Sequence, residues 1–269
     1  MTGSEAASII AAGPKQPRIH LLLYGVAMNN PLGVIFDMDG VLIDTYESHF
    51  RSWQMMAAEA GLTISEEQFA ATFGRTSREV LGTLWGPDRF SPEEISRWDA
   101  RKEELFRALI IADFPAMPGV KDLLRDLAAA GFALAIGSSA PPENVELVVE
   151  RIKMRGLFDA IVTGADVTRG KPDPQVFMTA AARLRLPPEW SAVVEDAPLG
   201  IAAAQAAGAA SIALVSTGRK REQLTAADLV VDRLAELSPQ RIEELILRHA
   251  EEAGEEVGET IDLFEDDTE

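Results

Sequence analysis

The chain of 269 residues contains no cysteine. A disulfide framework, a thiolate nucleophile and a zinc site with cysteine ligands are therefore excluded, and nothing argues for an oxidising compartment. No apolar run approaches the roughly eighteen uncharged residues that a membrane span needs, so we expect no transmembrane helix. A basic stripe that could hold nucleic-acid phosphates is also missing, which argues against nucleic-acid binding. We expect a soluble, globular protein with a cytoplasmic location.

Positive charge is scarce, since the chain has 25 basic and 43 acidic residues and a net charge of -18. Ten of the acids lie within the last nineteen residues. A block of like charge favours a solvated, disordered tail over a partner-binding segment, and we assign residues 250–269 to such an acidic tail. Residues 1–32 are expected to form a flexible N-terminal extension, because they lack the charged start and the cleavage site of a signal peptide.

Hydrophobic residues make up 47% of the chain, enough to fill a sizeable core. From Gly33 onward, short apolar runs alternate with segments in which apolar residues recur every three or four positions. This alternation predicts a doubly wound, Rossmann-like α/β fold, in which helices cover both faces of a parallel sheet. The expected strands are residues 33–36, 132–137, 159–164, 191–195, 211–215 and 227–231, and the expected core helices are residues 121–131, 143–152, 173–184 and 199–208.

The alternation is interrupted at residues 46–114, which show helical patterns but no strand pattern. Residues 65–68 and 91–94 carry the capping-box signal of a helix start. The sequence therefore predicts an all-helical cap domain inserted between two parts of the α/β core, 33–45 and 115–249. Because the insertion leaves the core just after the first strand, it can cover the end of that strand.

Polar side chains follow four of the expected strands at the point where each strand ends. Ligands bind beyond the carboxyl ends of the strands in open α/β sheets, so we expect these side chains to converge. Converging carboxylates repel one another and are tolerated only with a cation among them, and oxygen-only ligands indicate Mg²⁺. The expected magnesium ligands are Asp37, Asp39, Glu195 and Asp196.

A lysine and two hydroxyl groups lie at the same strand ends, namely Lys171, Ser138 and Ser139. Beside a cation they form a site for a dianion, and a phosphoryl group fits both the charge and the geometry. The two serines precede an expected helix start, where backbone N–H groups bind anions well. The sequence therefore predicts a phosphate pocket at this edge of the sheet.

Two aspartates separated by one residue suit phosphoryl transfer. Asp37 would attack phosphorus and form an aspartyl-phosphate, which splits one difficult displacement into two easier ones. Asp39 would protonate the leaving oxygen and then deprotonate the incoming one. Gly40 would permit the tight turn that directs both side chains.

The segment DMDGVLIDT at residues 37–45 resembles the nucleophile motif of the haloacid dehalogenase superfamily of phosphotransferases. Ser138 resembles the phosphate-binding serine or threonine of this family, Lys171 resembles its lysine, and EDAPLGIAAAQAAG at 195–208 resembles its metal motif. The likeness covers residues 33–231. It implies Asp37 as nucleophile, Asp39 as acid and base, Lys171 in catalysis, and Glu195 with Asp196 at magnesium.

The helical insertion is similar to that of the β-phosphoglucomutase-like branch of this superfamily, which includes many sugar-phosphate phosphatases. The likeness lies in ESHFRSW at residues 47–53. It implies that His49 is a lid or hinge residue near the reacting phosphate. GRTSRE at residues 74–79 resembles the substrate loop and nominates Arg78 for a distal anionic group, while Lys102 is a further candidate from the same lid.

Three positions distinguish this chain from mutases of that branch, which carry a Lys-Asn pair after the phosphate-binding serine and a serine after the acidic pair. Here these positions are Pro141, Pro142 and Ala197. We therefore expect a monomeric, Mg²⁺-dependent phosphatase acting on a small phosphorylated metabolite such as a sugar phosphate. A phosphosugar mutase is the alternative. A phospho-receiver signalling module fits less well, because a receiver needs neither Asp39 nor a lid.

Overall fold

The computed structural model describes residues 21–23, 26–28 and 31–265. Its centre is a six-stranded sheet with the strand order β5-β4-β3-β6-β7-β8, in which every neighbouring pair is parallel. Each strand overlaps a segment that the sequence predicts, and the doubly wound α/β core is thereby confirmed. The strands are β3 Gly33–Phe36, β4 Ala133–Gly137, β5 Ala160–Val162, β6 Ser191–Glu195, β7 Ala210–Leu214 and β8 Leu229–Val231.

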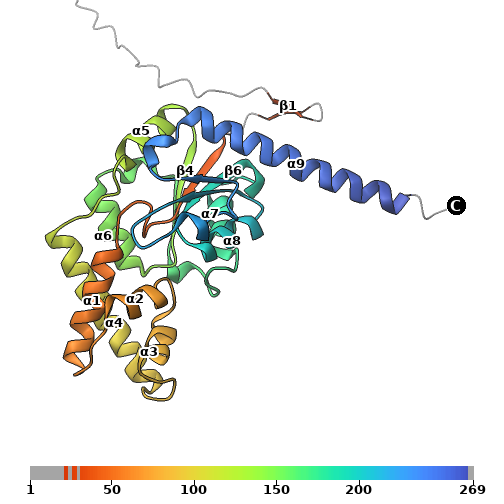
Figure 1. Ribbon diagram of the computed structural model, residues 1–269. Helices are drawn as coiled ribbons and strands as arrows, with labels where there is room; N and C mark the ends of the chain where they lie inside the picture. The colour runs from red at the N-terminus through yellow and green to blue at the C-terminus, as the bar shows by residue number, and fades with distance from the viewer. Residues whose placement is uncertain (1–20, 24–25, 29–30, 266–269) are drawn as a thin grey trace, which may run out of the picture.

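Helices cover both faces of the sheet, because successive side chains of a strand point to opposite faces (Figure 1). Along β3, the fully buried Val34 and Phe36 pack with residues of α5, α6 and α9, whereas Ile35 packs with residues of α7 and α8. These helices are α5 Val120–Ala129, α6 Pro142–Ile152, α7 Gln175–Leu184, α8 Pro198–Ala206 and α9 Pro239–Glu265. Short 3₁₀ helices lie in the connections: η1 Arg155–Leu157, η2 Gly164–Asp166, η3 Pro188–Trp190, η4 Arg221–Gln223 and η5 Leu234–Glu236.

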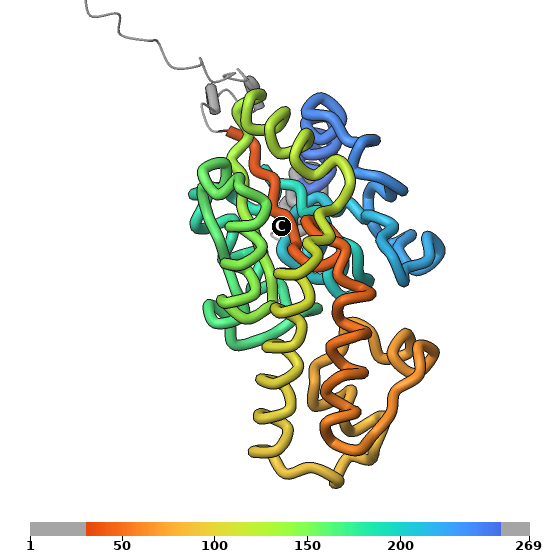
Figure 2. The backbone as a smooth tube through the Cα atoms, turned by 90° about the vertical axis from the view of Figure 1, so that its left-hand side faces the viewer, coloured from red at the N-terminus to blue at the C-terminus, as the bar shows by residue number. Residues whose placement is uncertain are grey.

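The inserted segment forms a cap of four helices between β3 and α5, at one end of the core (Figures 1 and 2). All of residues 46–114 are described, and they contain no strand, which confirms the predicted helical cap. Helices α1 and α4 lie side by side, and the cap has its own apolar cluster around Trp53, Phe69 and Leu81. The cap helices are α1 Tyr46–Glu59, α2 Glu66–Thr72, α3 Ser77–Trp85 and α4 Pro92–Ala112.

Local sequence signals set where the cap helices begin. Ser65 starts α2 with a capping box in which Gln68 reciprocates, and Ser91 starts α4 in the same way with Glu94. Pro92 occupies the first turn of α4, where its missing N–H costs nothing. Both predicted starts are confirmed, so local sequence signals mark where α2 and α4 begin.

The two ends of the chain differ from the sequence-based expectation. Residues Leu21–Leu23 (β1) and Val26–Met28 (β2) pair as antiparallel strands within the segment expected to be a flexible extension. Helix α9 continues to Glu265, into the segment expected to be a disordered tail. Residues 250–265 contain no proline and are rich in the good helix former Glu. The remainder of both predictions, residues 1–20 and 266–269, lies outside the described residues. Within the described part of the chain, no helix has both the length and the apolarity to cross a membrane.

The Ser91→Ala variant is expected to lower the free energy of unfolding by about 1 kcal/mol, because the N–H of Glu94 loses its acceptor. Urea unfolding followed by circular dichroism measures the change. Ser96→Ala is the matched control: Ser96 is exposed in the interior of α4, where alanine is the better helix former and should not destabilise. Equal stability of the two variants would contradict the capping role of Ser91.

Candidate active site

The register of the sheet places Asp37 at the centre of the candidate site. Asp37 follows β3, and its N–H donates to the carbonyl oxygen of Val194 at 2.9 Å, next to the end of β6. Glu195 ends β6 and Asp196 follows it. One carboxylate oxygen from each of these three acids lies within 4.8 Å of the others, and all three residues are buried. The structure thus brings together three of the four expected metal ligands.

The three acids, called here the carboxylate cluster (Asp37, Glu195 and Asp196), are crowded with negative charge. Burial, with the nearby charges of Glu195 and Asp39, raises the pKa of Asp37 well above its ordinary value, although Lys171 opposes the shift. Burial and the charge of Glu195 raise the pKa of Asp196 to about 6. A divalent cation with a preference for oxygen ligands would relieve this repulsion. The cluster therefore fits Mg²⁺ both in its donor atoms and in its need for positive charge.

Lys171 provides positive charge inside the cluster from the loop between η2 and α7. Its Nζ lies 2.9 Å from Oδ1 of Asp37 and 2.5 Å from Oε1 of Glu195, and its side chain is 13% exposed. The ammonium group also lies 4.8 Å from the ring centre of the buried Phe177. Burial alone would lower the pKa of Lys171, but the two carboxylates outweigh it and raise the pKa. Lys171 is therefore a fixed positive charge beside Asp37.

The second oxygens of Glu195 and Asp196 are held by groups of the protein. Oε2 of Glu195 accepts from the backbone N–H groups of Asp196 and Ala197 at 2.7 and 2.8 Å. Oδ2 of Asp196 accepts from the hydroxyl of Ser216 at 2.7 Å and lies 3.6 Å from Nε of Arg219. Ser216 and Arg219 were not expected from the sequence. The rule of collecting polar residues after each strand, applied to β7, would have found Ser216.

The side chain of Asp39 lies apart from the carboxylate cluster, although the sequence predicts that it shares the metal site. Its Oδ1 lies 3.4 Å from Nε2 of His49, on the cap side. Burial would raise the pKa of Asp39, but His49 and Lys102 outweigh it and the pKa is lowered. Within the described residues Asp39 is not a member of the cluster, and its position suits proton transfer better than metal binding.

Gly40 explains how two acids so close in sequence face different ways. Its φ of +76° belongs to the left-handed region that favours glycine, and the chain turns there. A Cβ at this position would overlap the carboxylate of Asp196. The glycine therefore lets the backbone of the turn lie against the carboxylate of Asp196, while the side chain of Asp39 points toward the cap.

A chain of polar contacts joins Asp39 to the cap and to α6. Nζ of Lys102 lies 2.9 Å from Nδ1 of His49, and because an ammonium group can only donate, Nδ1 accepts and the ring proton is on Nε2, facing Asp39. Glu103 accepts from Lys102 at 2.7 Å and from Nδ2 of Asn144 at 2.6 Å. The structure thus brings His49 and Lys102 next to Asp39. Glu103 and Asn144 belong to no motif, and no signal in the sequence identifies them.

The other site residues predicted from the sequence form no hydrogen bond or ion pair with the carboxylate cluster in the part of the chain that the structure describes. Ser138 is buried after β4 and its hydroxyl accepts from the N–H of Ala140 at 3.1 Å, while Ser139 is exposed. Helix α6 has no side-chain cap at its start. Arg78 is exposed in the first turn of α3, and among the described residues no ion pair or hydrogen bond links its side chain to the cluster.

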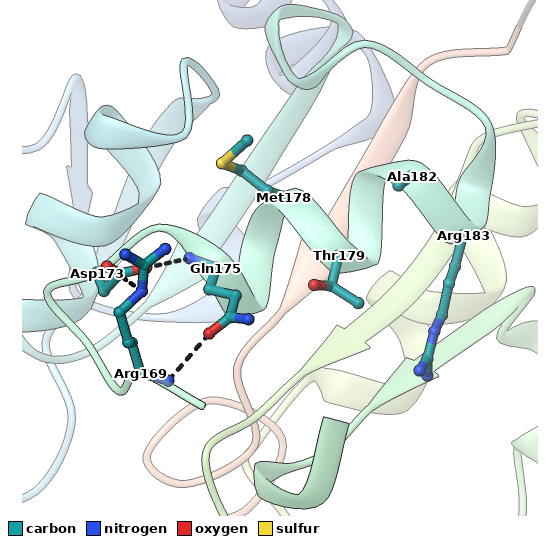
Figure 3. A pocket seen from close by; sticks show the side chains of 7 residues that line it. All are labelled: Arg169, Asp173, Gln175, Met178, Thr179, Ala182 and Arg183. Carbon is teal, nitrogen blue, oxygen red and sulfur yellow. Dashed lines mark hydrogen bonds and ion pairs between the residues drawn. The ribbon is translucent and has the colours of Figure 1, made fainter. Parts of the chain in front are cut away.

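An open groove beside the Lys171 loop is shown in Figure 3. At one end Arg169 pairs with Asp173 at 2.9 Å, and the side chain of Gln175 accepts from the backbone N–H of Arg169 at 2.9 Å. Along α7 the half-exposed Met178 lines it. The contacts at its polar end brace the loop that carries Lys171, so we assign the groove a supporting position outside the carboxylate cluster.

Comparison with known proteins agrees with this arrangement. Residues 34–214 match the family described as haloacid dehalogenase-like hydrolase. A β-phosphoglucomutase of Bacillus subtilis is 32% identical over 220 residues, which cover 78% of this chain and 93% of that protein. A phosphorylated carbohydrates phosphatase of Thermotoga maritima is 30% identical over 175 residues, which cover 65% of this chain and 81% of that protein.

The solved structures give the same picture. A crystal structure of β-phosphoglucomutase from Clostridium difficile superposes with a TM-score of 0.72 at 27% identity, covering 81% of this chain and 98% of that one. The family match spans well over half of the chain, from β3 through β7, and includes the whole carboxylate cluster. The chain therefore belongs to the haloacid dehalogenase-like hydrolase family.

Proposed function

We propose that this chain is a Mg²⁺-dependent phosphatase that hydrolyses a small phosphorylated metabolite, a sugar phosphate, through an aspartyl-phosphate on Asp37. The observation that carries the proposal is the buried contact of 2.9 Å between Asp37 and Lys171, inside a cluster with Glu195 and Asp196. A buried nucleophile with a permanent cation beside it suits a dianionic phosphoryl group.

Asp37, Glu195 and Asp196 would hold the magnesium ion, since they offer oxygen donors from one buried cluster. When bound, the cation supplies neutralisation of the charge on the phosphoryl oxygens. The high pKa of Asp37 in the cation-free protein is consistent with this requirement, because the nucleophile must be ionised to attack. Lys171 contributes in the same direction from 2.9 Å.

In the first half-reaction an oxygen of Asp37 forms a bond to phosphorus while the bond from phosphorus to the metabolite oxygen breaks. Asp39 donates a proton to that leaving oxygen. Ser138 follows β4, and Lys171 lies in the connection after the neighbouring strand β5. Both would stabilise the transferring phosphoryl group. The metabolite then leaves with its hydroxyl restored.

In the second half-reaction water attacks the phosphorus of the aspartyl-phosphate and the bond to Asp37 breaks, which releases inorganic phosphate. Asp39 takes the proton from the attacking water. The contact between Asp39 and His49 supports this role, because it favours the ionised form of Asp39. Every group in this scheme comes from a single chain, so we propose that the enzyme works as a monomer.

Water rather than a second sugar is favoured as the final acceptor by the residues after Ser138. Pro141 occupies the N-cap position of α6 and Pro142 begins the helix, so neither position offers a polar side chain to a second phosphate group. Two curated relatives are named as phosphatases of phosphorylated carbohydrates or of validoxylamine A 7'-phosphate, which supports a sugar-like substrate. Arg78 in the cap is proposed to contact the part of the substrate away from the reacting phosphate. Lys102, expected from the sequence to do the same, is buried and paired with His49 and Glu103, so we propose that it positions His49 instead.

A phosphosugar mutase is the second candidate, favoured by 32% identity to the β-phosphoglucomutase of Bacillus subtilis. A mutase shares the first half-reaction and differs only in the group that attacks the aspartyl-phosphate. Cap closure decides between the two outcomes, since it admits or excludes water.

A panel of sugar phosphates and two- or three-carbon phosphates, each incubated with Mg²⁺, is expected to yield inorganic phosphate from at least one compound. The Asp37→Asn variant should lower turnover by about a thousandfold or more, because an amide cannot form the acyl phosphate. Phosphate release by a colorimetric assay gives the rate, and circular dichroism verifies that the variant is folded. Conversion of glucose 1-phosphate to glucose 6-phosphate without phosphate release would contradict the hydrolase and support the mutase.

The Asp196→Asn variant is expected to stabilise the metal-free protein at pH 7. The pKa of Asp196 in the folded protein, about 6, lies above its ordinary 3.8, so bound protons favour the fold and stability falls as pH rises from about 4 to 6. The gain from asparagine is therefore absent near pH 4 and complete above pH 6, at about 3 kcal/mol. Urea unfolding in EDTA across this range measures it.

Magnesium should narrow this difference, since at about a hundred times its dissociation constant it stabilises the parent by about 2.7 kcal/mol and the variant by less. Asp122→Asn is the matched control, because Asp122 is an exposed acid of α5 whose carboxylate is 81% exposed. Its effect should not depend on pH in this way. A destabilised Asp196→Asn protein in EDTA at pH 7 would refute the account of charge crowding.

A further inference from the structure

The four residues 216–219, called here the strap, follow β7 and connect the candidate site with the cap. At its first residue, the hydroxyl of Ser216 donates to Oδ2 of Asp196 at 2.7 Å. The hydroxyl of Thr217 donates to Oδ2 of Asp44 at 2.5 Å, and Asp44 lies two residues before the start of α1. Two consecutive side chains of the strap thus contact the carboxylate cluster and the residues that lead into the cap.

Gly218 brings the strap against the first residue of the cap. Its φ of +82° lies in the left-handed region, and a Cβ on it would overlap the ring of Tyr46. Tyr46 packs in turn edge-on against Phe69 and Phe73, with ring centres 5.2 and 5.0 Å away. Only glycine fits at position 218, so this close contact between core and cap is built into the backbone.

Arg219 contacts the cluster and the cap at the same time. Its Nε lies 3.6 Å from Oδ2 of Asp196, and its guanidinium carbon lies 4.5 Å from the ring centre of Phe73. The next residue, Gly74, is also close, since a Cβ there would lie 3.1 Å from a guanidinium nitrogen. The side chain is only 12% exposed, and among the described residues its buried Nε has no hydrogen-bond partner.

We propose that Arg219 is a positioning residue that couples the carboxylate cluster to the cap. Its charge acts on Asp196, while its planar face holds Phe73 at the start of the segment 74–79, which carries Arg78. The proposal rests on the magnesium site of the proposed function and assigns it a link to the substrate-facing part of the cap.

The coupling between Arg219 and a bound cation is expected to be unfavourable, because both are positively charged and both act on the carboxylate of Asp196. A cation at the cluster weakens the attraction between Asp196 and Arg219, and Arg219 in turn disfavours the cation. Metal binding therefore loosens the hold of the strap on Phe73, and removal of the guanidinium group frees the cap while it favours the metal.

The test uses the full-length, substrate-free protein and its Arg219→Gln variant, titrated with MgCl₂ by isothermal calorimetry. The variant should bind Mg²⁺ roughly fivefold more tightly or better, in the range of typical coupling between two sites. Hydrogen–deuterium exchange in residues 66–85, which form α2 and α3, should be faster than in the parent. Damage to the fold would weaken metal binding, so tighter binding is a result that a merely structural role does not produce.

Two further variants separate the charge from the planar face. Arg219→Lys keeps the positive charge, so its Mg²⁺ affinity should stay near that of the parent, but it lacks the planar group and its cap should exchange faster. Arg221→Gln is the matched control, because Arg221 lies two residues further on, is half-exposed and pairs with Asp232 at 2.7 Å. It should leave both the affinity and the exchange unchanged.

Equal Mg²⁺ affinity in Arg219→Gln and Arg221→Gln, or unchanged exchange of the cap in Arg219→Gln, would overturn the coupling. If the parent itself binds no Mg²⁺, both the coupling and the proposed function fail. If the parent binds Mg²⁺ and the Arg219 variants do not differ from the control, only the coupling fails.

Discussion

Repulsion among three buried carboxylates is the constraint on which the site depends. Asp37, Glu195 and Asp196 are brought together by the parallel register of β3 and β6, and burial prevents water from screening them. Lys171 supplies one positive charge, which is less than the cluster carries. The raised pKa values of Asp37 and Asp196 express this shortage of positive charge. Under the proposed function, a divalent cation would supply the missing charge and would share it with a phosphoryl group.

The cap is connected to the acids of the site through two separate sets of contacts. On one side, His49 faces Asp39 and is held by Lys102, which pairs with Glu103; Glu103 also accepts a hydrogen bond from Asn144. On the other side, the strap of residues 216–219 contacts Asp196 and the aromatic residues at the base of the cap. Because both sets end on acids of the site, a change in cap position alters the surroundings of Asp39 and of the carboxylate cluster together. Access of water to an aspartyl-phosphate would depend on both.

Much of the fold follows from local patterns, while the contacts between core and cap do not. Periodicity placed all six strands of the main sheet, and capping signals placed the starts of α2 and α4. The strand-end rule gathered Asp37, Lys171, Glu195 and Asp196, because parallel strands align their carboxyl ends. It failed for the direction of the Asp39 side chain, which the turn at Gly40 sets. It also missed Arg219 and the pairing of Glu103 with Asn144, since these depend on how the cap lies against the core, which no local pattern encodes.

The most direct test of the account is to locate the phosphoryl group during turnover. The enzyme is mixed with Mg²⁺ and a substrate that releases phosphate, quenched in acid within the steady state, digested and analysed by mass spectrometry. The account predicts an acyl phosphate, labile to hydroxylamine, on the peptide that contains Asp37. A phosphoryl group on another residue, or turnover without any covalent phosphoenzyme, would contradict it.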